Sequence, residues 1–120
     1  MSTRNTEYQD TSLQTVPLLL WKKIVVALTG AAAGVPLVEA GAANFTAAQR
    51  LILLAPPTND VTSDHSKDVT FGTTVACDCG YLAPGATIDL SPPHGRRINL
   101  QDIYVKAPGA DDETVVALYL

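Results

Sequence analysis

Two cysteines lie two residues apart in the segment VACDCG, as Cys77 and Cys79. On an extended strand, side chains two residues apart point to the same face, so the two thiols would lie side by side. At that separation, however, the β-carbons are farther apart than the roughly 3.8 Å that a disulfide prefers. The spacing therefore predicts two separate thiols, with intermolecular bonding as the alternative.

The other residues that could do chemistry are two histidines and a run of acids. A zinc site needs four ligands, and His65 and His94 have no further ligand at a recognisable spacing. Both histidines fall in turn-like segments, which favours exposed loop residues over catalytic bases. The adjacent acids Asp111 to Glu113 lack the spacing of a calcium loop and predict a solvated turn. Since TGAAAGVP also lacks the Lys and Ser/Thr of a phosphate-binding loop, we expect no enzyme, no metal and no cofactor.

Composition indicates one ordered domain whose surface is poor in charge. The chain has 120 residues, of which 47% are hydrophobic and 17% charged, and its formal net charge is -4. Lys and Arg are spread along the sequence, and the pairs Lys22-Lys23 and Arg96-Arg97 are too small to neutralise a phosphate backbone, so we expect no nucleic-acid partner. The uncharged run Ile24 to Val38 is shorter than the roughly 20 residues of a membrane helix, so we expect no membrane span.

Beyond residue 45 the pattern is one of short strands separated by Pro and Gly turns. The Ala83–Ala86 segment predicts a type II turn, in which Gly85 supplies the positive φ. Short strands at intervals of about 8 to 12 residues are typical of antiparallel sandwiches. We therefore predict an all-β fold, an antiparallel β-sandwich that is jelly-roll-like or immunoglobulin-like. The apolar or alternating segments are Leu51–Leu54, Val69–Cys79, Ala86–Leu90, Ile103–Val105 and Val115–Leu120.

The final segment, RINLQDIYVKAPGADDETVVALYL, predicts a hairpin in which an acidic turn joins two strands. Its last strand is apolar on both faces, as expected for an interior strand of a sandwich or for a strand covered by a neighbour. A second copy of the same protein would serve as that cover, so we expect a homo-oligomer.

The first part of the chain differs from the rest. Residues 1 to 15 are polar and lack a sustained period, whereas Val16 to Leu28 is a dense apolar segment that favours an extended backbone. We predict an N-terminal arm and interaction segment over residues 1–44 and a β-sandwich domain over residues 45–120. A chain without residues 1–28 is expected to stay folded and to lose docking. The predicted contact residues are Val16, Leu18, Leu20, Trp21, Ile24 and Val26, with Trp21 either an anchor or part of the core.

Four segments together resemble a pattern in small structural proteins of tailed bacteriophage particles. They are AAQRLILLAPPTN, VTFGTTV, GYLAPGATIDLSPP and the final RINLQDIYVKAPGADDETVVALYL, and they cover roughly residues 45–120. The resemblance implies a β-sandwich that sits on the virion, as a capsid decoration (cement) protein, a head-fibre base or a neck or tail component. The segment VPLLLWKKIVV and the alanine-rich region after it have no counterpart in that pattern.

The main hypothesis is therefore a virion structural protein, above all a capsid decoration protein, assembled in the cytoplasm of the bacterial host. Its expected partners are the major capsid protein or other virion proteins and further copies of itself. The alternative from another class is an exported carbohydrate- or surface-binding β-sandwich module, with residues 1 to about 43 as an atypical leader. A small enzyme would need His65 or His94 in a cleft beside Asp or Cys.

Overall fold

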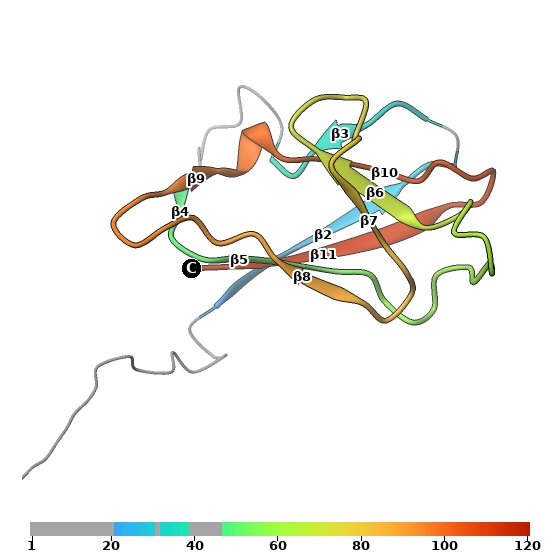
Figure 1. Cartoon of the computed structure of the whole chain (residues 1–120), viewed down its shortest axis with the longest axis horizontal. Helices are drawn as coiled ribbons and strands as arrows, with labels where there is room; N and C mark the ends of the chain where they lie inside the picture. The colour runs from blue at the N-terminus through green and yellow to red at the C-terminus, as the bar shows by residue number, and fades with distance from the viewer. Residues whose placement is uncertain (1–20, 31, 39–46) are drawn as a thin grey trace, which may run out of the picture.

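The computed structural model describes residues 21–30, 32–38 and 47–120, and these form an all-β body (Figure 1). Every strand pair is antiparallel. One sheet has the order β2-β11-β5-β8, a second has the order β3-β10-β6-β7, and β4 pairs with β9. The elements are β2 (Lys22–Leu28), β3 (Val35–Pro36), β4 (Ala47–Ala48), β5 (Leu51–Leu54), β6 (Val69–Gly72), β7 (Gly80–Leu82), β8 (Thr87–Asp89), β9 (Ile98–Asn99), the 3-10 helix η2 (Leu100–Asp102), β10 (Tyr104–Lys106) and β11 (Glu113–Tyr119).

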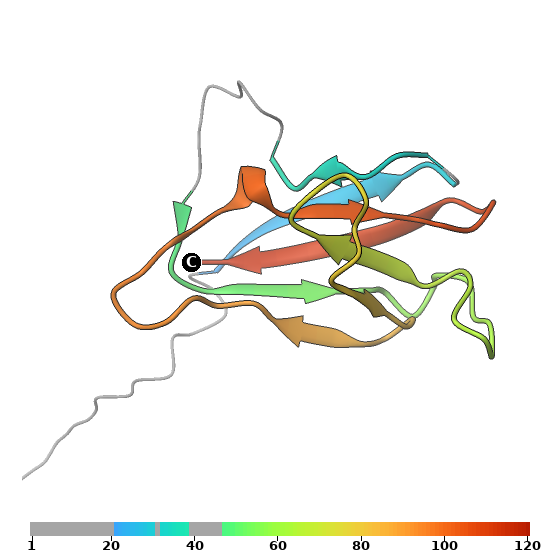
Figure 2. The ribbon, with the colours of Figure 1, turned by 45° about the horizontal axis from the view of Figure 1, so that its top comes forward.

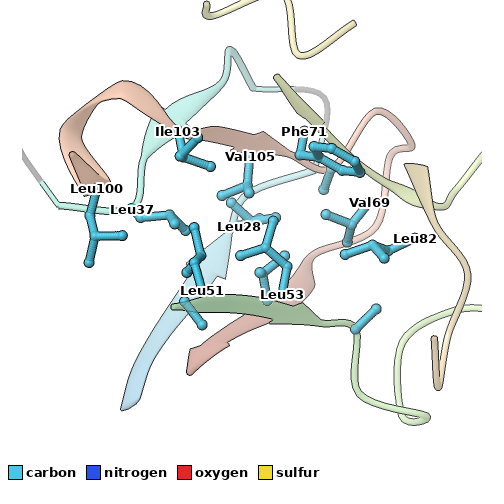
Figure 3. Close-up of a cluster of buried hydrophobic side chains, with 14 of the residues drawn as sticks. Leu28, Leu37, Leu51, Leu53, Val69, Phe71, Leu82, Leu100, Ile103 and Val105 are labelled. Carbon is cyan, nitrogen blue, oxygen red and sulfur yellow. The ribbon is translucent and has the colours of Figure 1, made fainter. Parts of the chain in front are cut away.

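The core lies between the two four-stranded sheets (Figure 3). Because side chains alternate between the faces of a strand, every second residue of each strand enters it. Leu51 and Leu53 enter from β5, and Val69 and Phe71 enter from β6 in the facing sheet. The predicted all-β antiparallel sandwich is thus confirmed.

The predicted boundary between an arm and a domain at residue 44 is wrong, because β2 belongs to the sandwich. All seven residues of β2 pair with β11, from Lys22 opposite Tyr119 to Leu28 opposite Glu113. Leu28 is buried in the core, and β3 pairs with β10 in the second sheet. The sequence pattern correctly predicted an extended backbone up to Leu28, but it did not indicate that the distant strand β11 pairs with this segment.

The predicted C-terminal hairpin is also wrong. β10 and β11 lie in different sheets, so residues 107–112 cross from one layer of the sandwich to the other. The crossing buries the apolar sides of both strands, since Val105 faces the core from one sheet and Val115 from the other. The expectation of an interior strand is confirmed, because β11 lies between β2 and β5.

The turn predicted at Ala83–Ala86 is present. The amide of Ala86 donates to the carbonyl of Ala83 at 2.9 Å, and Gly85 has a φ of 84°. Gly85 also donates to Ala55 at 2.7 Å, which fixes the turn against the end of β5. Glycine suits this place because the left-handed region costs it nothing.

The alternating pattern predicted that Cys77 and Cys79 lie on one strand, and this prediction is wrong. β6 ends at Gly72, and the chain then turns so that Cys77 has a φ of 51° and donates its amide to Thr74 at 3.0 Å. Both thiols are free, Cys77 buried and Cys79 exposed. Burial raises the pKa of the Cys77 thiol.

We expect an alkylating reagent to modify Cys79 at least about tenfold faster than Cys77, because only the exposed thiol meets the reagent without an opening of the fold. Mass spectrometry of peptides taken at successive times measures the two rates. In denaturant the two rates should converge. Equal rates in the native protein would contradict the burial of Cys77.

Candidate interaction surfaces

The sheet β2-β11-β5-β8 has an apolar outer face. In Figure 2 its four strands lie side by side, and the cross-strand register aligns their outward residues. One row runs from Val25 through Val116 to Leu54, and the next row places Leu118 beside Ile52. We call this surface the outer apolar face; it consists of Val25, Ala27, Ile52, Leu54, Val116 and Leu118.

The opposite sheet has a different outer surface. The outward residues of β6, β7 and β10 are polar or aromatic: Thr70, Tyr81, Tyr104 and Lys106. Tyr81 contacts the ring of His65, with their centroids 4.8 Å apart. Continuous aliphatic patches on a protein surface mark contact sites, so the outer apolar face is the candidate contact surface and the opposite face is suited to water.

The predicted contact residues divide into three groups. Val16, Leu18 and Leu20 lie outside the described residues. For Ile24 and Val26 the contact prediction is wrong, because both side chains pack against the core of their own molecule.

Trp21 is half-buried, immediately before β2, with the guanidinium of Arg50 6.0 Å from its ring centroid. Val25 is not among the predicted contact residues, yet it is 57% exposed, on the opposite side of β2 from Ile24 and Val26. Because side chains alternate along a strand, the sequence already indicated that Val25 lies on the other face from Ile24 and Val26.

The free edge of the same sheet adjoins the outer apolar face. β2 pairs with β11 on one side, and within the described ranges no strand pairs with its other side. A seven-residue edge strand can accept a further strand from a partner. Lys22 and Lys23 are exposed at its start, and edge lysines discourage unspecific pairing.

The fold gathers basic residues at one end of the sandwich. β2 begins beside the last residues of β11, and the amide of Arg50 donates to the carbonyl of Leu120. Arg50 and the loop from Ser91 to Arg97 line a hollow of about 520 Å³. These cations are spread along the sequence, and the fold brings them together. We define the basic end as Lys22, Lys23, Arg50, Arg96 and Arg97.

The other end of the sandwich is acidic. Lys67 Nζ lies 2.7 Å from Asp111 Oδ2 and 3.7 Å from Asp60 Oδ2, so one cation joins two loops. The hydrogen bond from Lys67 lowers the pKa of Asp111, whereas the hydrogen bond shared with Asp111 raises the pKa of Asp60. The acidic end comprises the exposed Asp60, Asp64, Asp111 and Asp112 and the buried Asp68 and Glu113.

The acidic end is held together through Asn59 and Glu113. Pro56 and Pro57 have no amide hydrogens, so the backbone there cannot extend the pairing of β5 with β11. The side chain of Asn59 takes over: its Nδ2 donates to the carbonyl of Thr114 at 2.9 Å, and its Oδ1 accepts from the Thr114 amide at 3.0 Å. Next to it, Glu113 Oε1 accepts from the Asp60 amide at 3.0 Å, while Oε2 has no hydrogen-bond partner.

Glu113→Gln is expected to stabilise the protein at pH 7. Burial raises the pKa of Glu113 above the ordinary 4.5, and the charges of Asp60 and Asp111 raise it further. The folded state then keeps a proton that the unfolded chain has lost, so stability falls as pH rises from about 4.5 through the raised pKa. Removing the charge should raise the melting temperature by a few degrees at pH 7, because glutamine is neutral at every pH and carries no buried charge beside Asp60 and Asp111.

Thermal melts from pH 4 to pH 8 test this, and the gain should shrink toward pH 4 because wild-type Glu113 is then protonated as well. Asp112→Asn is the control, because it removes an exposed charge and keeps an acceptor for the amide of Gly30, now 2.9 Å from Asp112 Oδ1. A gain for Glu113→Gln that is equal at both ends of the range would contradict the assignment.

Neither histidine stands in a hydrolytic arrangement. His65 Nδ1 lies 2.6 Å from Oδ2 of the buried Asp68, so His65 has the carboxylate neighbour that a catalytic histidine needs. Its ring packs against Tyr81, and in the described chain no Ser or Cys is hydrogen-bonded to it. His94 lines the hollow at the basic end without a carboxylate partner in the described chain. The His65–Asp68 pair fastens a loop whose His65 has a φ of 62°.

The described residues contain no group of three or more His, Cys, Asp or Glu side chains placed to hold a metal ion. They also contain no helix with the length and apolar character needed to cross a membrane.

Comparison with protein families, with curated proteins and with solved structures finds no significant match to this chain. The resemblance to structural proteins of tailed phages therefore depends on the strand and turn segments quoted above.

Proposed function

We propose that the protein is a structural component of a tailed-bacteriophage particle, a capsid decoration protein that acts by contact and not by catalysis. The observation that carries this proposal is the outer apolar face, which lies on the side of its sheet away from the core; Val25 and Ala27 are exposed there and the other four side chains are half-buried. Aliphatic side chains from three adjacent strands form one continuous patch there, and such patches on soluble proteins mark contact sites.

The make-up of this face fits a protein interface. Its centre is aliphatic, while Lys23, Thr87 and Asp89 stand around it in the same cross-strand rows. An apolar centre with a polar rim is the usual anatomy of a stable contact. A rigid sheet also costs little ordering entropy on binding, because its backbone is already fixed by pairing on both sides of β11.

The proposed partner is the major capsid protein or a neighbouring virion protein, and the proposed location is the surface of the assembled particle. A decoration protein must attach to a finished shell without enclosing it. A sandwich that presents one flat apolar sheet and one polar sheet is suited to this, because one side docks and the other faces water.

The test uses the purified full chain and assembled shells of the phage that encodes it, prepared without this protein. We expect it to sediment with the shells in a saturable amount and to raise the temperature at which they disrupt. Absence from purified particles by mass spectrometry, together with failure to bind shells, would overturn the proposal. Binding to isolated necks or tails instead would keep a structural role and overturn the decoration role.

A further inference from the structure

Opposite charges lie at opposite ends of this sandwich. β11 runs from the acidic end, at Glu113, to the basic end, at Tyr119, and β2 runs back beside it (Figure 1). Seven residues of strand therefore separate the two ends by about 20 Å. Of the described lysines and arginines, only Lys67 and Lys106 lie away from the basic end.

The cations of the basic end form no ion pair with another described residue. The ion pairs of the described residues all lie at the opposite end. Arg96 and Arg97 are exposed, and the turn before them is fixed by the Arg96 amide, which donates to Pro93 at 3.0 Å. Arg50 is positioned by the ring of Trp21 and by a 3.4 Å contact from its Nε to Ser91 Oγ. Guanidinium groups on a fixed backbone are well suited to bind carboxylates.

The acidic end offers such carboxylates on exposed loops. Asp112 uses one oxygen to accept from the amide of Gly30, and its side chain stays exposed. Asp64 accepts from the amide of Ser66 at 3.1 Å and is exposed as well. Lys67 is the one lysine or arginine among these acids in the described chain, so the end keeps a net negative charge.

We propose that the acidic end of one molecule binds the basic end of a second copy, head to tail. Charge complementarity selects this occupant and this orientation, because like ends repel one another and a two-fold contact between equal ends is disfavoured. A contact between two different ends repeats, so it generates rows or rings of copies. The inference goes beyond the proposed function and does not depend on it, because it concerns the purified chain alone.

Sedimentation velocity of the full chain tests the contact. We expect association at about 50 mM salt that weakens at least tenfold at about 500 mM salt, because screening removes attraction between exposed charges. Two variants then separate the ends. Arg96→Glu with Arg97→Glu removes most of the positive charge of the basic end, and Asp64→Asn with Asp111→Asn and Asp112→Asn removes three of the six acidic groups of the acidic end while keeping hydrogen-bond acceptors.

Each variant alone should be monomeric at low salt. A mixture of the two should form a complex of one copy of each, because one variant keeps a native acidic end and the other a native basic end. Asp78→Asn is the control, since Asp78 is an exposed acid in the turn between β6 and β7, outside both ends, and this variant should associate like the wild type. Thermal melts establish that each variant is folded.

A wild-type chain that is monomeric at low salt would overturn the proposal, and so would association that salt does not weaken. A mixture that stays monomeric would overturn it as well. If the acidic-end variant does not fold, the salt dependence and the Arg96→Glu, Arg97→Glu variant decide the matter. Shell binding that persists in a head-to-tail-deficient variant leaves the proposed function standing, so the two proposals fail separately.

Discussion

Replacing Val25 and Val116 by lysine is expected to leave the protein folded and to weaken its attachment to the shell by roughly a hundredfold. Val25 is 57% exposed, and the two side chains stand opposite each other in one row of the outer apolar face. Lysine places two ammonium groups at the centre of the contact, where burying an unpaired charge is costly. Co-sedimentation with shells at increasing protein concentration measures the loss.

A matched control is available in the same chain. Val75, in the turn between β6 and β7, is 56% exposed, so Val75→Lys makes the same chemical change as Val25→Lys at the same exposure, away from the outer apolar face. We expect this variant to bind shells like the wild type. If Val75→Lys and the face variant bind equally well, the outer apolar face is not the docking surface.

The second large effect concerns the start of the described chain. Removal of residues 1–28 is expected to unfold the protein, whereas the sequence alone predicts a folded sandwich after this deletion. The deletion takes away the whole of β2, including the buried Leu28 and the core contacts of Ile24 and Val26. Fully burying an aliphatic side chain contributes about 1.5–3 kcal/mol. Together these losses are comparable with the roughly 5–15 kcal/mol that holds a domain together.

The informative comparison is a chain that lacks residues 1–20 only, because it keeps every strand pair of the described sandwich. Its circular dichroism spectrum and a cooperative melt should match those of the full chain. A sharp melt for the chain without residues 1–28 would show that β2 is dispensable, contrary to its pairing with β11.

Local patterns predicted the turns and the strand class well, for a physical reason. The positive φ of Gly85 and the proline before it are properties of two adjacent residues, and no distant contact is needed to favour that turn. The hairpin failed for the opposite reason. The alternation of β10 and β11 reports that each strand has one buried side, but it does not say which strand lies alongside, and that choice is made by packing across the whole sandwich.

The candidate surfaces likewise depend on contacts between residues that are distant in the sequence. The alternation along β2 could have separated Val25 from Ile24 and Val26, but only once the side of the strand that meets the core was known. The basic end joins positions as distant as Lys22, Arg50 and Arg97, which the antiparallel sheets bring together. Charge counted along the chain does not anticipate such clusters.

The place of β11 in its sheet has a consequence for biosynthesis. Translation delivers β2 and β5 first, yet the strand that must lie between them leaves the ribosome after every other described strand. The nascent chain therefore carries two unsatisfied strand edges until β11 has been synthesised, and such edges are a hazard for misassembly. A chain truncated before β11 would lack the central strand of the sheet. Such a product of early ribosome stalling would not fold and would be degraded by proteases.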